Sequence, residues 1–351
     1  MKVAIIGGTK GLGKTLAMIL SNENFDITIT GRDSTYGEKV AKELGVKYSK
    51  SNEKTASLNE IVIIAVPIDS TISIIEEIAS FLKEGSLLLD VTSVKVGPSE
   101  AMAKFLPDHV EFIPTHPVFG PRTNSLNGQV VVLTPLKKGK WYLKVFNFLK
   151  HHKVRIIESS PKEHDDMMSI VQILTHFSYI STAIAMERLG VNISQTRKFA
   201  SPIYNLMVDM ISRIVSQNPF LSYSIQIENE NGENVRKVFT ESVKELKDIL
   251  SLKEEEEFIK LVSEATENMD DIQAALGRSD KAIDSLTREL SLLKNSVGEE
   301  IVIEHIYSKK RYIGILKELG PIYLSIATAN AVKKLKIANI KILSKESLDD
   351  K

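Results

Sequence analysis

The first thirty residues hold the feature that most constrains the fold of this 351-residue chain. An apolar run, 2–6, leads into a glycine-rich segment, Gly7–Gly13, which is followed by an amphipathic helical pattern over 14–20 and a second apolar run over 25–30. This spacing predicts a strand–helix–strand unit with parallel strands. Glycines between a strand and a helix let a pyrophosphate approach the backbone N–H groups at the helix N-terminus. The opening unit therefore predicts a dinucleotide-binding site.

The glycine loop departs from the G-x-G-x-x-G pattern at its middle position. With Gly8 as the first glycine, Lys10 takes the second place and Gly13 the third. Lys10 either contacts a phosphate or faces solvent. A glycine-rich turn without a ligand is the alternative, and the strand–helix–strand context disfavours it. The residues predicted to bind the cofactor here are Gly8, Thr9, Lys10, Gly11, Leu12 and Gly13.

The end of the second predicted strand bears on which dinucleotide binds. NAD sites usually place Asp or Glu there for the ribose hydroxyls, whereas an Arg receives the 2′-phosphate of NADP. Here Thr30 and Gly31 are followed by Arg32, whose guanidinium matches a phosphate in charge and in geometry. The neighbouring Asp33 could serve a ribose instead. The sequence therefore favours NADP and leaves NAD open.

Four further apolar runs alternate with amphipathic helical patterns. They cover residues 61–66, 86–91, 130–133 and 154–157. This alternation predicts a doubly wound parallel sheet, a Rossmann domain, whose ligand lies outside the carboxyl ends of the strands. We expect this domain to span 1–160. Val66 and Pro67 end one of the runs at the corner that points toward the cofactor, so we expect both to contact it.

Polar residues follow two of the predicted strands, at 90–95 and 112–122. His116 directly follows an apolar run and stands between Pro114 and Pro117, which stiffen its segment. A lone His is more often structural, but this position makes His116 the best candidate for acid–base chemistry. No grouping of His, Asp and Glu has metal-ligand spacing, so we expect no metal. The chain has no cysteine, which excludes disulfides, Cys-based metal sites and a thiol nucleophile.

A helical domain is expected over 161–295. A long, almost charge-free helix is predicted over 167–189, where Gln172 and His176 are four residues apart and share a face. A second helix ends near Ser216 and carries Arg213. The sequence leaves open whether His176 and Arg213 are satisfied core groups or face a ligand. Helices this apolar need partners on several sides, which predicts a core shared with a second subunit.

The chain changes character after residue 297. Short alternating or clustered apolar runs predict strands near 300–305, 313–316, 322–326 and 335–343. We expect a small β-rich C-terminal module over 298–351. It would be regulatory, an element of a dimer, or a packing module without a ligand.

The composition excludes some partners. Lys and Arg together number 45, as do Asp and Glu, so there is no electrostatic argument for nucleic acid or an anionic membrane. No apolar stretch approaches the ~18 residues of a membrane span. The N-terminus has the pattern of a strand rather than a signal peptide. We expect a soluble, cytoplasmic protein.

Taken together, the motifs match a known family. They are, in order, the loop 7–13, Asp90-x-x-Ser93-x-Lys95, His116-Pro-x-Phe-Gly-Pro, and the helical segments 172–177 and 201–213. In this order and at these intervals the set resembles the prephenate dehydrogenase family of tyrosine biosynthesis, closest to its archaeal-type members. The resemblance covers about residues 1–270 and leaves the C-terminal module unexplained.

The resemblance implies a role for each matching residue. His116 accepts a hydrogen bond from the 4-hydroxyl of prephenate and acts as the base while that carbon becomes a carbonyl. Ser93 orients the hydroxyl and His116. Arg213 holds a substrate carboxylate. Gln172 belongs to a helical segment that forms the substrate pocket, and His176 contributes on the other side of that pocket.

The implied reaction is the NAD(P)-dependent oxidative decarboxylation of prephenate to 4-hydroxyphenylpyruvate and CO2. It needs a base near neutral pKa, a cation for the dianionic substrate, and a nicotinamide beside the ring. The predicted enzyme prefers NADP, forms a homodimer, and is a candidate for feedback by tyrosine. In some relatives an Arg occupies the position of Asn205, so this chain departs from them at a second cationic contact.

Three alternatives remain open. Arogenate carries an amino group where prephenate has a keto group, so it is a second candidate substrate. Other two-domain dehydrogenases, of the 6-phosphogluconate or hydroxyacid type, generally use a Lys of the helical domain, and 167–213 offers only Lys198, outside the centres of both apolar helices. The non-enzyme alternative is a nucleotide-sensing regulator with the β-rich module as its interaction element.

Overall fold

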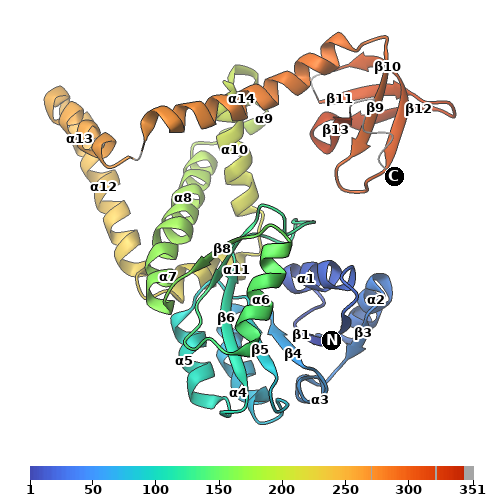
Figure 1. Cartoon of the computed structure of the whole chain (residues 1–351). Coiled ribbons are helices and arrows are strands. Elements are labelled where there is room, and N and C mark those ends of the chain that lie inside the picture. The colour runs from blue at the N-terminus through green and yellow to red at the C-terminus, as the bar shows by residue number, and fades with distance from the viewer. Residues whose placement is uncertain (270, 321, 344–351) are drawn as a thin grey trace. The chain divides into compact units, whose positions relative to one another are not determined.

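The computed structural model describes residues 1–269, 271–320 and 322–343 (Figure 1). The chain divides into two compact units. One comprises residues 1–190 and 210–248, and the other comprises 191–209 and the chain from 249 onward. The bounds that we expect for the three domains differ from this division and stay a prediction.

The first unit is built on an eight-stranded sheet of order β3-β2-β1-β4-β5-β6-β7-β8. Its strands are β1 Lys2–Ile6, β2 Asp26–Thr30, β3 Lys47–Ser49, β4 Ile61–Ile64, β5 Leu87–Asp90, β6 Glu111–Pro117, β7 Val130–Leu133 and β8 Arg155–Glu158. The first six are parallel, which confirms the doubly wound Rossmann architecture. However, β7 runs antiparallel to β6, and β8 runs parallel to β7. No helix separates β6 from β7, and a parallel pair needs such a crossover.

Helices cover both faces of this sheet. They are α1 Gly11–Ser21, α2 Ser34–Leu44, α3 Asn52–Leu58, α4 Ile68–Ala79, α5 Val96–Phe105 and α6 Lys140–His151. Val3 and Ile5 of β1 pack with α1 and α2, while Ala4 and Ile6 pack with α3, α4 and α5. Because successive side chains of a strand point to opposite faces, β1 is buried on both sides. This explains its unbroken apolar sequence.

The same unit continues into helices. They are α7 Pro161–Met168, a π-helical turn η1 Ser169–Leu174, α8 Thr175–Arg188, the last turns of α10 Pro202–Val215, α11 Pro219–Ile227, and most of α12 Gly232–Leu252. A cluster of buried side chains joins these helices to the sheet domain: Ile68, Val94, Ile173, Ile225 and Val235. The first part of the helical region therefore packs firmly on the Rossmann domain.

The run from α7 through α8 corrects one expectation. By length and composition alone, Pro161–Arg188 is apolar and long enough to cross a membrane, although no such stretch was expected. Within its most apolar stretch of 18 residues, only 22% is buried inside the protein. The same run places His164 and Gln172 against His116 of the sheet. Its exposed apolar side chains include Ile170, Val171 and Ile184.

The second unit ends in a five-stranded antiparallel sheet, which confirms the β-rich module. Its elements are α9 Ile193–Thr196, η2 Arg197–Phe199, α13 Glu255–Glu267, α14 Ile272–Asn295, β9 Glu300–His305, β10 Arg311–Leu319, β11 Tyr323–Ala327, β12 Val332–Lys336, η3 Ile337–Asn339 and β13 Ile340–Leu343. The strand order is β12-β11-β10-β9-β13, so the single strand expected over 335–343 is two. Leu293 of α14 and Ile303 and Leu316 of the sheet are fully buried together. Residues 344–351 of the expected module lie outside the described part.

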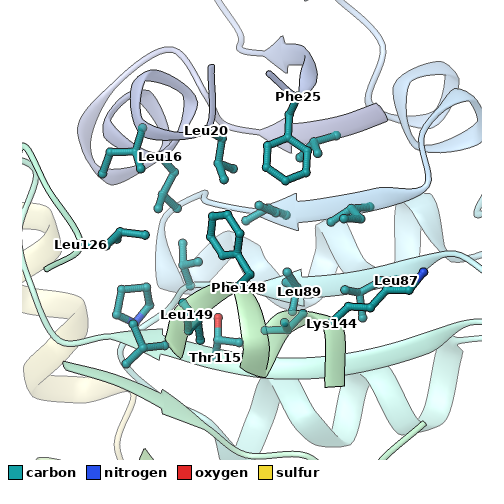
Figure 2. A pocket seen from close by; sticks show the side chains of 18 of the residues that line it. Leu16, Leu20, Phe25, Leu87, Leu89, Thr115, Leu126, Lys144, Phe148 and Leu149 are labelled. Atoms are coloured by element: carbon teal, nitrogen blue, oxygen red, sulfur yellow. The ribbon is translucent and has the colours of Figure 1, made fainter. Parts of the chain in front are cut away.

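A cavity of about 150 Å³ lies between the sheet and helices α1 and α6 (Figure 2). Leu16, Leu89 and Phe148 are among its almost entirely apolar lining. Thr115 and Pro117 of β6 line it as well, and alternation along the strand directs His116, between them, to the opposite face. The cavity is therefore separate from the polar site on β6.

Candidate active site

The glycine loop leaves no room for side chains at two positions. A Cβ on Gly7 would lie 2.6 Å from the carbonyl oxygen of Ala65, and a Cβ on Gly13 would lie 2.5 Å from the carbonyl oxygen of Gly7. Gly7 also has a φ of +83°, which favours glycine. These glycines let α1 pack closely against the ends of β1 and β4.

In contrast, the loop is open at Gly11. Nothing lies within 4 Å of a Cβ built there, and its φ is +54°. Gly11 is also the first residue of α1, so the N–H groups of this turn have no acceptor within the helix. A tight loop that opens onto a helix N-terminus fits the pyrophosphate of a dinucleotide.

The other residues predicted to bind the cofactor lie around this loop. The side chain of Val66 lies beside Gly7, and exposed Pro67 precedes α4. Thr9 packs against the end of β2, since a Cβ on Gly31 would lie 2.6 Å from its hydroxyl. The ammonium of Lys10 lies 4.9 Å from the centre of the Tyr36 ring.

Asp33 and Arg32 differ in what they contact. The Asp33 carboxylate accepts a hydrogen bond from the backbone N–H of Tyr36 at 3.0 Å and so caps α2. Arg32 is exposed and makes no ion pair within residues 1–269, 271–320 and 322–343. The carboxylate that competed for a ribose role is thus engaged in capping, and the guanidinium is available.

A chain of hydrogen bonds runs through His116. Its Nδ1 lies 2.8 Å from Nε2 of His164, whose own Nδ1 lies 2.7 Å from Oδ1 of Asp165. On the other side of the ring, Nε2 of His116 lies 3.4 Å from the amide nitrogen of Gln172. All three members of the His116–His164–Asp165 chain are at most 3% exposed. The structure therefore brings His116 and Gln172 together and adds two partners.

Asp165 is anchored by the start of α5. Its two carboxylate oxygens accept the backbone N–H groups of Lys95, at 2.7 Å, and Val96, at 2.9 Å. A carboxylate is favourable there because the helix dipole and the unpaired N–H groups attract negative charge. The backbone carbonyl of Asp165 accepts from the Asn229 amide at 2.8 Å. Asp165 thereby joins α7 to α5 and to the segment before α12.

The local sequence fixes where α7 begins. The Ser160 side chain accepts the N–H of Glu163, whose carboxylate returns to the N–H of Ser160, and Pro161 occupies the first turn. This capping box places His164 and Asp165 in the opening turns of the helix. Their direction toward β6 and α5 follows from this start.

A buried ion pair lies beside the His116–His164–Asp165 chain. The Lys95 ammonium, fully buried, forms an ion pair with the Asp90 carboxylate at the end of β5. The Thr92 hydroxyl bonds to the same carboxylate, and the N–H of Thr115 donates to its other oxygen at 3.3 Å. Burial lowers the pKa of Lys95, and Asp90 partly offsets this. Removing one partner would leave an uncompensated buried charge.

Burial strongly favours the neutral form of His116. It lowers the pKa of His116 well below 6.5, and the positive charges that His164 and Lys95 can carry add to the effect. A neutral imidazole has one nitrogen that donates and one that accepts. His116 is therefore uncharged at neutral pH and can accept a hydrogen bond on one ring nitrogen, whereas the sequence predicted a base with a pKa near neutrality.

The remaining predicted residues make fewer contacts. Ser93 is half-buried and has no hydrogen bond to His116 among the described residues. His176 is half-buried, burial lowers its pKa, and its Nδ1 has no partner in the part of the chain that the structure describes. Arg213, in the last turn of α10, is exposed and forms no ion pair with any described residue. These three assignments stay predictions.

Asn205, the position that departs from the relatives, has a cationic neighbour. Its amide oxygen accepts from Arg197 at 3.0 Å, and the same guanidinium bonds to Asp209 at 2.5 Å. A positive charge therefore lies on this face of α10 even though the residue itself is neutral.

The sequence interpretation missed the roles of His164, Asp165, Asp90 and Lys95. The capping box Ser-Pro-Lys-Glu before the His-Asp pair was the available signal, because it predicts a helix start directly after a strand. Among the described residues, no group of three or more His, Asp or Glu side chains is placed to hold a metal ion.

Comparison with known proteins identifies the relatives of this chain. Residues 16–158 match the family model "Prephenate dehydrogenase, nucleotide-binding domain", and residues 160–264 match "Prephenate dehydrogenase, dimerization domain". A probable arogenate/prephenate dehydrogenase of Methanocaldococcus jannaschii is 40% identical over 99% of this chain and 79% of its own length. This chain belongs to the prephenate dehydrogenase family. It is an NAD(P)-dependent dehydrogenase, and its place in tyrosine biosynthesis follows from the family.

Two further relatives extend the comparison. The T-protein of Haemophilus influenzae is 30% identical to this chain. The aligned residues cover 68% of this chain and 59% of that protein. The crystal structure of prephenate dehydrogenase from A. aeolicus, in complex with hydroxyphenyl propionate and NAD+, covers 76% of this chain and 96% of its own. Its TM-score is 0.60 at 21% identity, so it shows a common fold.

Proposed function

We propose that the protein is a prephenate dehydrogenase that converts prephenate to 4-hydroxyphenylpyruvate and CO2 with NADP. The observation that carries this proposal is His116, a fully buried, neutral imidazole whose Nε2 faces Gln172 and whose Nδ1 is held by His164. A dehydrogenase that oxidises an alcohol needs such a base beside the reacting carbon.

His116 takes the proton of the 4-hydroxyl on Nε2 as the ring carbon becomes a carbonyl. Bound NADP supplies the acceptor for the hydride, which carries an electron pair away from the same carbon. The bond to the ring carboxylate breaks, CO2 leaves, and the electrons of that bond complete the aromatic ring. One hydroxyl proton, one hydride and one CO2 therefore leave each prephenate before the phenol is protonated again.

The exposed cation Arg213 would hold a carboxylate of the substrate. A guanidinium binds a carboxylate through two parallel hydrogen bonds, and Arg213 has no competing acid among the described residues. Ser93 would orient the hydroxyl, while Gln172 and His176 would line the other side of the pocket. The Gln172 amide already shares a hydrogen bond with His116, which a substrate hydroxyl would replace.

Arg32 supports the choice of NADP. It follows β2, where the 2′ position of the adenosine ribose lies in a Rossmann domain, and its guanidinium is free of acidic partners among the described residues. Asp33 would otherwise favour NAD, but its carboxylate caps α2. NAD remains the alternative cofactor.

A homodimer and a cytoplasmic location complete the proposal. The apolar side chains exposed on 161–188 would be covered by the same helices of a second copy. The family model for this region carries the word dimerization, which supports that assignment. Feedback by tyrosine is part of the proposal because tyrosine is the end product that the reaction serves.

The test follows reduced nicotinamide by its near-ultraviolet absorbance. Purified protein is mixed with prephenate or arogenate, each with NADP or NAD, and with tyrosine in a parallel series. We expect the fastest rate with prephenate and NADP. A signal with arogenate alone would change the substrate, a faster rate with NAD would change the cofactor, and silence in all four mixtures would contradict the proposed function.

A further inference from the structure

We propose that His164, held by Asp165, is a positioning residue that keeps the Nε2 atom of His116 unprotonated and available to the substrate. This inference rests on the proposed function, since it assigns a task to the partner of the proposed base. It concerns two residues for which the motif match implied no role.

The hydrogen-bond partners fix the tautomers one after another. The Asp165 carboxylate is an acceptor, so Nδ1 of His164 carries a proton toward it at 2.7 Å. Neutral His164 then presents a lone pair on Nε2. The facing Nδ1 of His116, 2.8 Å away, must donate to that lone pair. His116 consequently has its own lone pair on Nε2.

The opposite tautomer of His116 conflicts with this arrangement. Nδ1 would carry a lone pair, and it would face the lone pair of His164 at hydrogen-bond distance. The conflict disappears if His164 takes up a second proton, as an imidazolium paired with Asp165, whereas two neutral rings fit these partners in one tautomer only. The observed partners therefore favour one state of the resting site.

The same chain supports the charge that the reaction creates. When the hydroxyl proton reaches Nε2, His116 becomes a cation among buried groups, and burial alone opposes that cation. The Nδ1 proton points to His164, which is backed by the Asp165 carboxylate. The negative charge of Asp165, two hydrogen bonds away from His116, thus offsets the positive charge of the His116 ring. Asp165 stays in place because α5 donates two backbone N–H groups to it.

Two substitutions separate positioning from packing. His164→Leu keeps much of the volume and removes the acceptor for His116. In His164→Gln, the amide oxygen reaches the place of Nε2 and accepts the same hydrogen bond. Exposed His109, in the turn after α5, provides the matched control His109→Gln.

We expect a specific kinetic pattern. His164→Leu should lower kcat by about 100-fold or more, the range of general-base effects, with less than about a threefold change in the KM for prephenate. The kcat of His164→Gln should be at least about tenfold higher than that of His164→Leu, because the Gln side chain restores the tautomer of His116. His109→Gln should match the wild type. Equal losses in Leu and Gln, or a kcat within about threefold of wild type in Leu, would overturn the inference.

A second readout does not depend on activity. Long-range proton–nitrogen correlation spectra of protein labelled with 15N-histidine distinguish the two tautomers, and His116→Asn identifies the His116 signals. We expect His116 to be protonated on Nδ1 in wild type and to lose that preference in His164→Leu. Protonation on Nε2 in the wild type would contradict the inference, and this result stands even if His164→Leu fails to fold.

The outcomes also separate this inference from the proposed function. If the wild type reduces neither cofactor with prephenate or arogenate, the proposed function fails, and the spectra alone decide the tautomer. If the wild type is active while His164→Leu keeps its kcat and its spectrum, only the positioning role fails.

Discussion

The two halves of the candidate site differ in how their side chains are held. In the buried half, His116, His164 and Asp165 satisfy one another, and each has its partner within the chain. In the exposed half, Arg213 and Arg32 extend into solvent with no ion pair among the described residues. The first half has its partners without a ligand, whereas in the second half we expect a ligand to supply the negative charge.

This difference assigns separate tasks to the two halves. A buried network with fixed donors and acceptors acts in a low-dielectric site, where it can stabilise charge that develops during the reaction. Exposed cations contribute little to the stability of the fold and act mainly on the affinity for anions. Changes in the buried half should therefore lower kcat or stability, and changes in the exposed half should raise KM.

The largest effect is expected for the base itself. His116→Asn should lower kcat by about 10³- to 10⁴-fold, because the reaction loses its proton acceptor. The affinity for NADP, measured by fluorescence titration, should stay within about twofold, since the cofactor loop is elsewhere. A kcat near that of the wild type would remove His116 from its assigned role.

Next comes the buried ion pair. Lys95→Ala leaves the Asp90 carboxylate without its partner, so the free energy of unfolding in urea should fall by about 3–5 kcal/mol. The matched control is Lys138→Ala, which removes an exposed partner of Glu158 and should cost about 0–1 kcal/mol. Similar losses in the two variants would mean that burial does not set the difference.

For the exposed half, Arg213→Ala should act on recognition. Losing a charged hydrogen-bond donor to a carboxylate should raise the KM for prephenate about 10- to 100-fold, with a smaller change in kcat. Steady-state kinetics measure both constants, and exposed Arg155→Ala on β8 serves as the control. An unchanged KM would place Arg213 outside the pocket.

A smaller effect is expected at the cofactor. Arg32→Ala should raise the KM for NADP about tenfold, because one charged contact to the 2′-phosphate is lost. The KM for NAD, which lacks this phosphate, should not rise. If both constants rise together, Arg32 acts on the loop and does not select the cofactor.

The smallest effect is a dependence of stability on pH. The folded state holds the pKa of His116 well below 6.5, and it also lowers that of His176, so the unfolded chain binds more protons at acidic pH. The contribution of these two histidines to the free energy of unfolding is therefore fully present above pH 6.5, and it is lost as the pH falls below that value. Urea unfolding between pH 7.5 and 5 should show a steeper loss for wild type than for His116→Asn. Parallel curves would mean that His116 is not buried in its neutral form.

The sequence predicted the parts of the site that depend on neighbouring residues. The glycine loop and the helical pattern around Gln172 follow from the local sequence, whereas His116, which was expected directly after a strand, lies within β6. The contact between His116 and His164 joins residues 48 apart, and no periodicity encodes it. The direction of β7 and the π-helical turn at Ser169–Leu174 also depend on packing. His164 was visible only through the capping box that precedes it.

One measurement tests the central claim most directly. With wild-type protein in excess over prephenate and saturating NADP, a single turnover is followed for reduced cofactor and for CO2. We expect one reduced cofactor and one CO2 for each prephenate, formed at the same rate, since oxidation of the ring carbon lets the electrons of the carboxylate bond complete the aromatic ring. CO2 without reduced cofactor, or no turnover at all, would contradict the account.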